Sequence, residues 1–207
     1  FQLWACKQVT DIAGVNSSKG HYPEGHDTRC PSCGVVEETR EHVLYCEEAG
    51  RVEALKLSIK WMDDWMRKEN TEPRLRKCLV AYAKGRGGRT MMSIVGDWGH
   101  RFRCLARSQD TIGWRRFMEG MISKKVVAIQ KDFVEAGGCA LSLENWAKGL
   151  VIKLLEVTHG QWLYRYTGIP VPVCRYTDTP VTQILEGPFS AVSNPIFGSK
   201  ASLFLSL

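Results

Sequence analysis

The sequence predicts a mainly α-helical protein with a small N-terminal zinc-binding module, a helical body and an irregular tail. Three observations support this class. Cysteine and histidine residues cluster between residues 30 and 46, apolar residues recur every three or four positions between residues 51 and 166, and this periodicity is absent after residue 168. We therefore divide the chain into a zinc-binding module over residues 1–50, a helical body over residues 51–167 and a tail over residues 168–207.

The first helices follow from apolar spacing and from capping residues. Residues 2–13 predict a short helix that leads into a polar loop and then into the cluster. Residues 51–68 predict an amphipathic helix, because apolar side chains recur in steps of three and four at Val52, Leu55, Ile59, Met62 and Met66. The next helix is expected to have Thr71 as its cap, Pro73 in its first turn and Gly85 after its last turn. A further helix is expected over residues 89–107.

Two longer helices complete the predicted body. Apolar residues recur from Trp114 to Phe133 and predict one continuous helix that ends at Gly137. Ser142 is typical of an N-cap, and the helix after it is expected to run for about six turns. No stretch of the body alternates with period two, so we expect no sheet there. After residue 168 prolines accumulate, which predicts a mostly irregular tail, disordered in part.

The cluster has the sequence CPSCGVVEETREHVLYC, with the spacing Cys-x2-Cys-x8-His-x3-Cys. The turn after Cys30 and Cys33 can point two thiolates at one ion. Thr39 is expected to cap a helix on which His42 and Cys46 lie one turn apart on the same face. Four such ligands complete the coordination of a tetrahedral zinc ion, so the sequence predicts a structural zinc site on Cys30, Cys33, His42 and Cys46.

Other interpretations of the cluster stay open at this point. Cys30 and Cys33 could form a redox pair, although no thioredoxin-like βαβ pattern surrounds them, or the four residues could be core residues by coincidence. His26 and His21 lie nearby, and either could replace His42 as a ligand, although the helical spacing favours His42.

The other cysteines are scattered singly, which is typical of reduced thiols in a reducing compartment: Cys6, Cys78, Cys104, Cys139 and Cys174.

The net charge of +6 is distributed unevenly. Residues 24–50 carry seven acidic and two basic side chains, whereas residues 51–169 carry twenty-two basic and twelve acidic ones. Any attraction for the phosphates of RNA or DNA therefore belongs to the helical body. The candidate nucleic-acid-binding residues are Arg101, Arg103, Arg107, Arg115 and Arg116, and Trp114 is placed to stack on an unpaired base. The alternative is an ordinary solvated helix face.

No arrangement of residues typical of catalysis is found, so we expect a chain that is not an enzyme and takes no small-molecule substrate. Asp63 and Asp64 interrupt a helical pattern, whereas a polymerase site needs such a pair on a β-hairpin. The stretch KGRGGR, residues 84–89, lacks the order of a P-loop and predicts a helix end and turn. This turn is expected to expose Arg86 and Arg89 as candidates for phosphate contact. His100 and His159 show no partner at ligand or triad spacing.

No apolar run reaches the ~18–20 residues that a membrane span requires, so no membrane partner is expected. The cysteine pattern and the lack of a leader-like segment predict an intracellular chain, nuclear or cytoplasmic. Because the sequence begins with Phe1, we expect an internal or C-terminal piece of a longer protein.

Several motifs together carry a resemblance. The motif W-x-C-K-Q at residues 4–8, the pattern CPSCGxxxETxxHVLxC and a GR step into a long helix resemble the zinc-binding region downstream of the reverse transcriptase domain in eukaryotic non-LTR retrotransposon polyproteins. The stretches QDTIGWRRFMEGMIS and LLEVTHGQWLYR are similar to the helical continuation of such reading frames in protists, over residues 1–166 in all. The resemblance implies a non-catalytic accessory region that helps to hold RNA or DNA, with the catalytic part of a longer polyprotein as a further partner. The alternative is a helical protein–protein interaction module with a structural zinc site.

Overall fold

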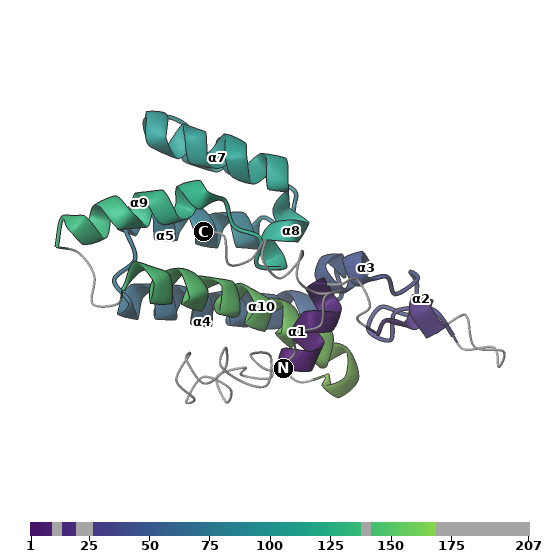
Figure 1. Cartoon of the computed structure of the whole chain (residues 1–207). Coiled ribbons are helices and arrows are strands. Elements are labelled where there is room, and N and C mark those ends of the chain that lie inside the picture. Colours follow the sequence, from purple (N-terminus) through teal and green to yellow (C-terminus); the bar gives the residue numbers. More distant parts are fainter. Residues whose placement is uncertain (10–13, 20–26, 138–141, 169–207) are drawn as a thin grey trace, which may run out of the picture. The chain divides into compact units, whose positions relative to one another are not determined.

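The computed structural model describes residues 1–9, 14–19, 27–137 and 142–168, all of which belong to one compact unit, Phe1–Val173 (Figure 1). These residues are mostly helical and form no strand. The helices are α1 (Gln2–Val9), α2 (Asn16–Lys19), α3 (Arg40–Tyr45), α4 (Ala49–Lys68), α5 (Pro73–Lys84), α6 (Met91–Val95), α7 (His100–Ile112), α8 (Trp114–Met118), α9 (Lys124–Glu135) and α10 (Leu143–Thr167). The predicted mainly α class is confirmed. The predicted irregular tail lies outside the described residues.

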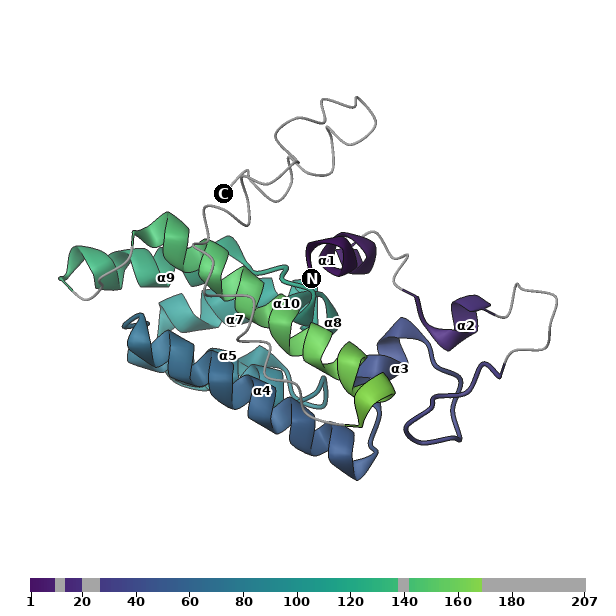
Figure 2. The same ribbon diagram turned by 90° about the horizontal axis from the view of Figure 1, so that it is seen from below.

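The core is built around α4 and α10, which lie side by side in Figures 1 and 2. The predicted apolar stripe of α4 is confirmed, because Leu55, Ile59 and Met66 are fully buried. Gly149 of α10 allows the close approach of the two helices, since a Cβ atom there would lie 2.5 Å from the ring of Trp65 on α4. Helices α5, α7, α8 and α9 complete the same apolar cluster.

Several predicted helix boundaries are wrong, and glycines explain most of the differences. The helix expected over residues 89–107 is two helices, α6 and α7, because Gly96 and Gly99 adopt φ angles of 46° and 100° between them. Gly120, with a φ of 85°, likewise separates α8 from α9 where one continuous helix was expected from Trp114 to Phe133. Positive φ angles are readily adopted by glycine, and each one ends a helical run.

Of the N-caps predicted for α5 and α10, the one for α10 is confirmed and the one for α5 is wrong. Ser142 caps α10 as expected, with its side chain accepting a hydrogen bond from the amide of Asn145. Helix α5 is capped by Glu72 instead of Thr71. Thr71 is buried, and its hydroxyl accepts a hydrogen bond of 2.9 Å from the indole of Trp146 on α10. Thr71 therefore joins α10 to the turn before α5.

None of the helices in the described part of the chain combines the length and the apolar character that crossing a bilayer requires.

Candidate metal centre

The first half of the candidate centre is a tight turn closed by backbone hydrogen bonds. Cys30 donates from its amide to the carbonyl of Val36 at 2.8 Å, and its carbonyl accepts from the amide of Gly34 at 2.8 Å. An antiparallel bridge joins Arg29 to Glu37 on the two sides of the turn. Gly34 adopts a φ of 68°, which a residue with a side chain rarely takes. The turn thus brings Cys30 and Cys33 to the same side.

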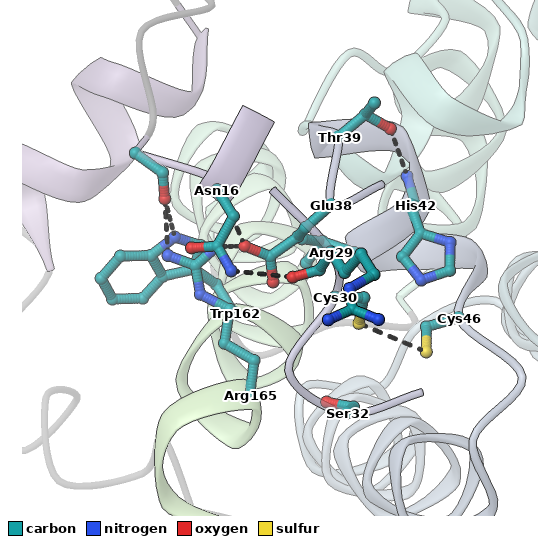
Figure 3. A network of polar contacts seen from close by, with 12 residues as sticks. Asn16, Arg29, Cys30, Ser32, Glu38, Thr39, His42, Cys46, Trp162 and Arg165 are labelled. Atoms are coloured by element: carbon teal, nitrogen blue, oxygen red, sulfur yellow. Dashed lines mark hydrogen bonds and ion pairs between the residues drawn. The ribbon is translucent and has the colours of Figure 1, made fainter. Parts of the chain in front are cut away.

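Helix α3 supplies the second half. Thr39 caps it as predicted, with its hydroxyl accepting a hydrogen bond of 3.0 Å from the amide of His42. The amide of Cys46 donates to the carbonyl of His42 at 2.7 Å, so the helical hydrogen-bond pattern continues to Cys46 although α3 ends at Tyr45. His42 and Cys46 therefore lie one turn apart on one face, toward the turn that carries the other two residues (Figure 3).

The four ligand atoms lie close enough to hold one metal ion. The sulfurs of Cys30, Cys33 and Cys46 and a ring nitrogen of His42 all lie within 4.8 Å of one another. The sulfurs of Cys30 and Cys46 are 3.9 Å apart, and the sulfur of Cys33 is 3.4 Å from Nε2 of His42. A tetrahedral ion with bonds of about 2.3 Å to sulfur and about 2.0 Å to nitrogen requires separations of about 3.5–3.8 Å. The separations of 3.9 Å and 3.4 Å are close to these values, and no other pair of ligand atoms is more than 4.8 Å apart.

The electrostatics of the thiols also fit a cation. Amide groups of Val36 and Val35 donate hydrogen bonds toward the sulfur of Cys33 and, together with His42, lower the pKa of this thiol to about 6 against the opposing effect of burial. Burial, followed by repulsion from Cys30, raises the pKa of the Cys46 thiol to about 11. Neighbouring thiolates thus repel each other in a buried place, and a positive ion between them would offset that repulsion.

Arg51 at the start of α4 holds the candidate centre to the helical body. Its guanidinium donates to the hydroxyl of Ser32 at 3.2 Å, to the carbonyl of Val43 at 2.6 Å and to the carbonyl of Gln161 at 3.0 Å. These partners lie in the Cys30–Cys33 turn, in α3 and in α10. Arg51 is fully buried, so one cation joins three segments away from water.

A buried ion pair forms a second connection (Figure 3). Glu38, next to the cap of α3, lies 2.8 Å from the guanidinium of Arg165 on α10, and both side chains are fully buried. The same carboxylate accepts a hydrogen bond of 2.9 Å from the amide of Asn16. Arg165 also donates to the carbonyl of Gly14 and lies 4.7 Å from the ring centre of Trp162. The segment before the turn is therefore also held against α10.

The turn after α5 makes a third connection. Arg86 donates a hydrogen bond of 2.8 Å to the carbonyl of Cys46, the last residue of the candidate centre. Gly87, with a φ of 74°, lies so close to Tyr45 of α3 that a Cβ atom there would be 2.7 Å from its hydroxyl. The predicted turn at residues 84–89 is confirmed. The expectation that Arg86 is free to contact phosphate is wrong, because its guanidinium is used inside the protein.

The candidate nucleic-acid-binding residues do not form one surface. Arg115 and Arg116 both contact the buried carboxylate of Glu119, at 3.1 Å each. Arg101 pairs with Asp132 on α9. Arg103 follows Arg101 by two positions on α7, so their side chains point in directions about 160° apart around the helix.

Arg107 is exposed and lies on α7 one turn beyond Arg103. Trp114 was expected to be available for stacking on a base, which is wrong. Its ring is buried, and its indole nitrogen donates to the carbonyl of Tyr82 at 2.9 Å.

The aspartates and histidines considered in the sequence analysis make contacts within the protein. Asp63 and Asp64 lie on α4 as expected; Asp63 pairs with Arg67 and Arg76, and Asp64 with Lys60. His100 does have a neighbour at ligand spacing, contrary to expectation, since Nε2 lies 3.5 Å from the sulfur of Cys104 one turn later.

His159 is a core residue packed against Trp4, with ring centres 4.6 Å apart. Burial lowers the pKa of His159 to about 4. The two alternative ligands, His21 and His26, lie outside the described residues.

The contacts of Arg51, Glu38 and Arg165 were not anticipated, although the sequence holds a signal for two of them. Arg51 lies four positions before Leu55, on the same stripe as the buried residues of α4. Arg165 likewise lies three turns after the buried Leu154, on the same face of α10. A charged residue that continues an apolar stripe is a candidate for a buried, paired charge.

No protein-family model, no curated protein and no solved structure matches this chain. The resemblance to a retrotransposon reverse transcriptase region therefore stays a prediction.

Proposed function

We propose that this chain is a non-catalytic, zinc-binding accessory region that binds RNA or DNA, in keeping with the resemblance to the region downstream of a retrotransposon reverse transcriptase. The observation that carries the proposal is the gathering of Cys30, Cys33, His42 and Cys46 within 4.8 Å of one another. Three thiols and one imidazole are a ligand set that zinc prefers, and four protein ligands leave no position open for a substrate.

The surroundings of the cluster favour a structural role for zinc. Arg51 and Arg86 each donate to a backbone carbonyl of the cluster region, and Glu38 pairs with Arg165 beside it. Such contacts fix the backbone that carries the ligands, as partners around a structural metal site do. Zinc in this place would join the N-terminal segment to the helical body.

The support for nucleic-acid binding is the separation of charge. The region around the cluster is acidic, whereas residues 51–169 carry a net positive charge. Phosphate backbones bind basic surfaces and release counterions on binding, so the interaction weakens steeply as salt is added. We therefore assign nucleic-acid binding to the helical body.

Zinc content tests the first half of the proposal. Protein made without added metal should contain one equivalent of zinc, and Cys33→Ser or His42→Ala should lose most of it. Cys104→Ser is the matched control, because Cys104 is a thiol near a histidine outside the cluster, and it should keep the full equivalent. Full zinc content in His42→Ala, with loss in a His26→Ala variant, would show that the ligand set is wrong.

A binding titration tests the second half. Fluorescence anisotropy with labelled single-stranded RNA, single-stranded DNA and duplex DNA should show affinity that falls linearly with the logarithm of salt concentration. Affinity that is absent for all three, or that does not change with salt, would refute nucleic-acid binding.

A helical protein–protein interaction module is the second candidate function, and one observation favours it. Val35 and Val36, at the tip of the turn of the candidate centre, are 79% and 49% exposed. Two exposed apolar side chains on a rigid turn are suited to a protein contact. Under this alternative, Val35→Ser with Val36→Ser would abolish binding to a protein partner, and nucleic acids would bind weakly or not at all.

A further inference from the structure

The stretch from residue 73 to residue 96 contains six basic side chains and no acidic one. It covers α5, the turn after it and α6. Two of the six basic side chains are used inside the protein, since Arg76 pairs with Asp63 and Arg86 donates to the carbonyl of Cys46. The other four are Arg74, Lys77, Lys84 and Arg89, which we call the α5 basic stripe.

The four members of the α5 basic stripe are exposed, and none of them forms an ion pair with a described residue. This distinguishes them from Arg101, Arg115 and Arg116, which are partly neutralised by Asp132 and Glu119. A cation without an acidic neighbour keeps its full attraction for an external anion. Arg107 on α7 and Lys124 and Lys125 on α9 are also exposed and form no ion pair with a described residue. The α5 basic stripe is larger, because it gathers four such cations in a segment that holds no acidic residue.

Helix geometry places the stripe on one face of α5. The buried residues of α5 include Leu75, Leu79 and Tyr82, which define the face toward the core. Arg74, Lys77 and Lys84 lie within an arc of about 80° on the opposite side and span about 15 Å along the axis.

The turn after α5 brings Arg89 back to the end of this row. Its Cβ atom lies 3.4 Å from the position that a Cβ atom would take on Gly85, the residue directly after α5. Gly88 is exposed and has no side chain, so it leaves room for an extended partner beside Lys84 and Arg89.

We infer that the α5 basic stripe is the surface on which this chain binds the phosphate backbone of a nucleic acid. A row of about 15 Å matches about four nucleotides of one strand of duplex DNA, at 3.4 Å per nucleotide. Lysine presents a compact charge and arginine a planar fork, and both suit phosphate oxygens. The row carries no residue placed to read bases, so it contacts the backbone without selecting sequence. This inference rests on the proposed function and moves the interface from the arginines of α7 and α8 to α5.

The test compares two variants that lose the same charge. The stripe variant is Arg74→Gln, Lys77→Gln, Lys84→Gln, Arg89→Gln. The control variant is Lys56→Gln, Lys60→Gln, Lys131→Gln, Lys148→Gln, in which each replaced lysine pairs with an acidic residue of its own helix. Either set lowers the formal net charge from +6 to +2. Circular dichroism and zinc content should be unchanged in both, since all eight side chains lie outside the core.

Binding of a labelled single-stranded RNA and a DNA duplex is then measured over a range of salt concentrations. We expect the slope of log affinity against log salt to flatten by about 0.7 per lost contact for the single strand and about 0.9 for the duplex. The stripe variant, with four lost contacts, should therefore lose up to about 2.8 for the single strand and up to about 3.6 for the duplex. The control variant should keep the slope of the original protein.

Equal effects of the two variants, or no effect of the stripe variant, would overturn the assignment to α5 while nucleic-acid binding itself stands. An original protein that binds neither nucleic acid refutes the proposed function and, with it, this inference. Anionic phospholipid vesicles bound in place of nucleic acid, and lost in the stripe variant, would assign the surface to lipid headgroups instead.

Discussion

Arg51 gives the sharpest test of how the candidate metal centre is joined to the helical body. Replacing it by methionine keeps the length of the side chain but removes the guanidinium that donates to Ser32, Val43 and Gln161. The carbonyls of Val43 and Gln161 then lose a buried donor, and water cannot reach them easily because the site is fully buried. Each buried carbonyl left without its donor costs about 1–3 kcal/mol, which centres the expected loss in the free energy of unfolding on about 4 kcal/mol.

The measurement is urea unfolding of metal-loaded protein, followed by circular dichroism. Arg51→Met should lose about 3–5 kcal/mol, a large part of the about 5–15 kcal/mol that holds a typical domain together. Arg51→Lys keeps the charge but cannot reach three segments at once, so it should lose about 2 kcal/mol and stay folded for measurement if Arg51→Met does not.

Arg67→Met is the matched control on the same helix. Arg67 is mostly exposed and makes one ion pair with Asp63, so its loss should cost less than about 1 kcal/mol. A chelator competition should also show weaker metal binding in Arg51→Met, because the turn and α3 lose their shared support. Unfolding within about 1 kcal/mol of the original protein, together with unchanged metal affinity, would refute the role given to Arg51.

Three further predictions concern the same end of the molecule. Glu38→Met and Arg165→Met should each lower the free energy of unfolding, measured in urea, by about 3–5 kcal/mol. The double variant should be more stable than either single variant, because it leaves no buried charge uncompensated. Additive losses in the double variant would contradict this. The pKa of the buried His159 is lowered to about 4, so the folded state binds fewer protons than the unfolded state between pH 6.5 and pH 4. The free energy of unfolding should therefore fall by up to about 3 kcal/mol as the pH is lowered across that window. A His159→Phe variant, measured in parallel, should show a shallower fall. Metal removal by a chelator should speed deuterium exchange at residues 158–167, because Gln161 and Arg165 contact the segments that carry the ligands. Helix α5 should stay protected, because none of the contacts to the centre comes from the helix itself; uniform exchange along the chain would mean that the fold opens as one unit.

The sequence was most informative where one local rule decides the structure. The gathering of Cys30, Cys33, His42 and Cys46 follows from a turn and one helical step, all within seventeen residues, and Thr39 and Ser142 cap their helices for local reasons too. The helix breaks at glycine were harder to predict, because apolar spacing continues across Gly120 as if the helix did not end.

Contacts between distant segments were not predicted. Glu38 looks like an ordinary surface charge in the sequence, and although Arg165 lies on the buried face of its helix, only the packing of α10 beside the turn shows that the two pair. The prediction that Trp114 stacks on a base is wrong for the same reason. An aromatic residue next to two arginines resembles a base-stacking site in the sequence, but in the fold Trp114 is covered by the core. Whether a charge or a ring is available to a partner depends on tertiary packing, which spacing along one helix does not report.

The pairing of Glu38 with Arg165 and of Arg51 with Gln161 also constrains the order in which the molecule can be assembled. The four thiol and imidazole groups lie within seventeen residues and can meet as soon as that stretch leaves the ribosome, because closing a short loop costs little entropy. The buried ion pair next to these groups can form only later. Glu38 and Arg165 are 127 positions apart, and α10 is the last described helix to be synthesised. During synthesis Glu38 beside α3 and Arg51 at the start of α4 therefore stay exposed to water until α10 has been made and covers them.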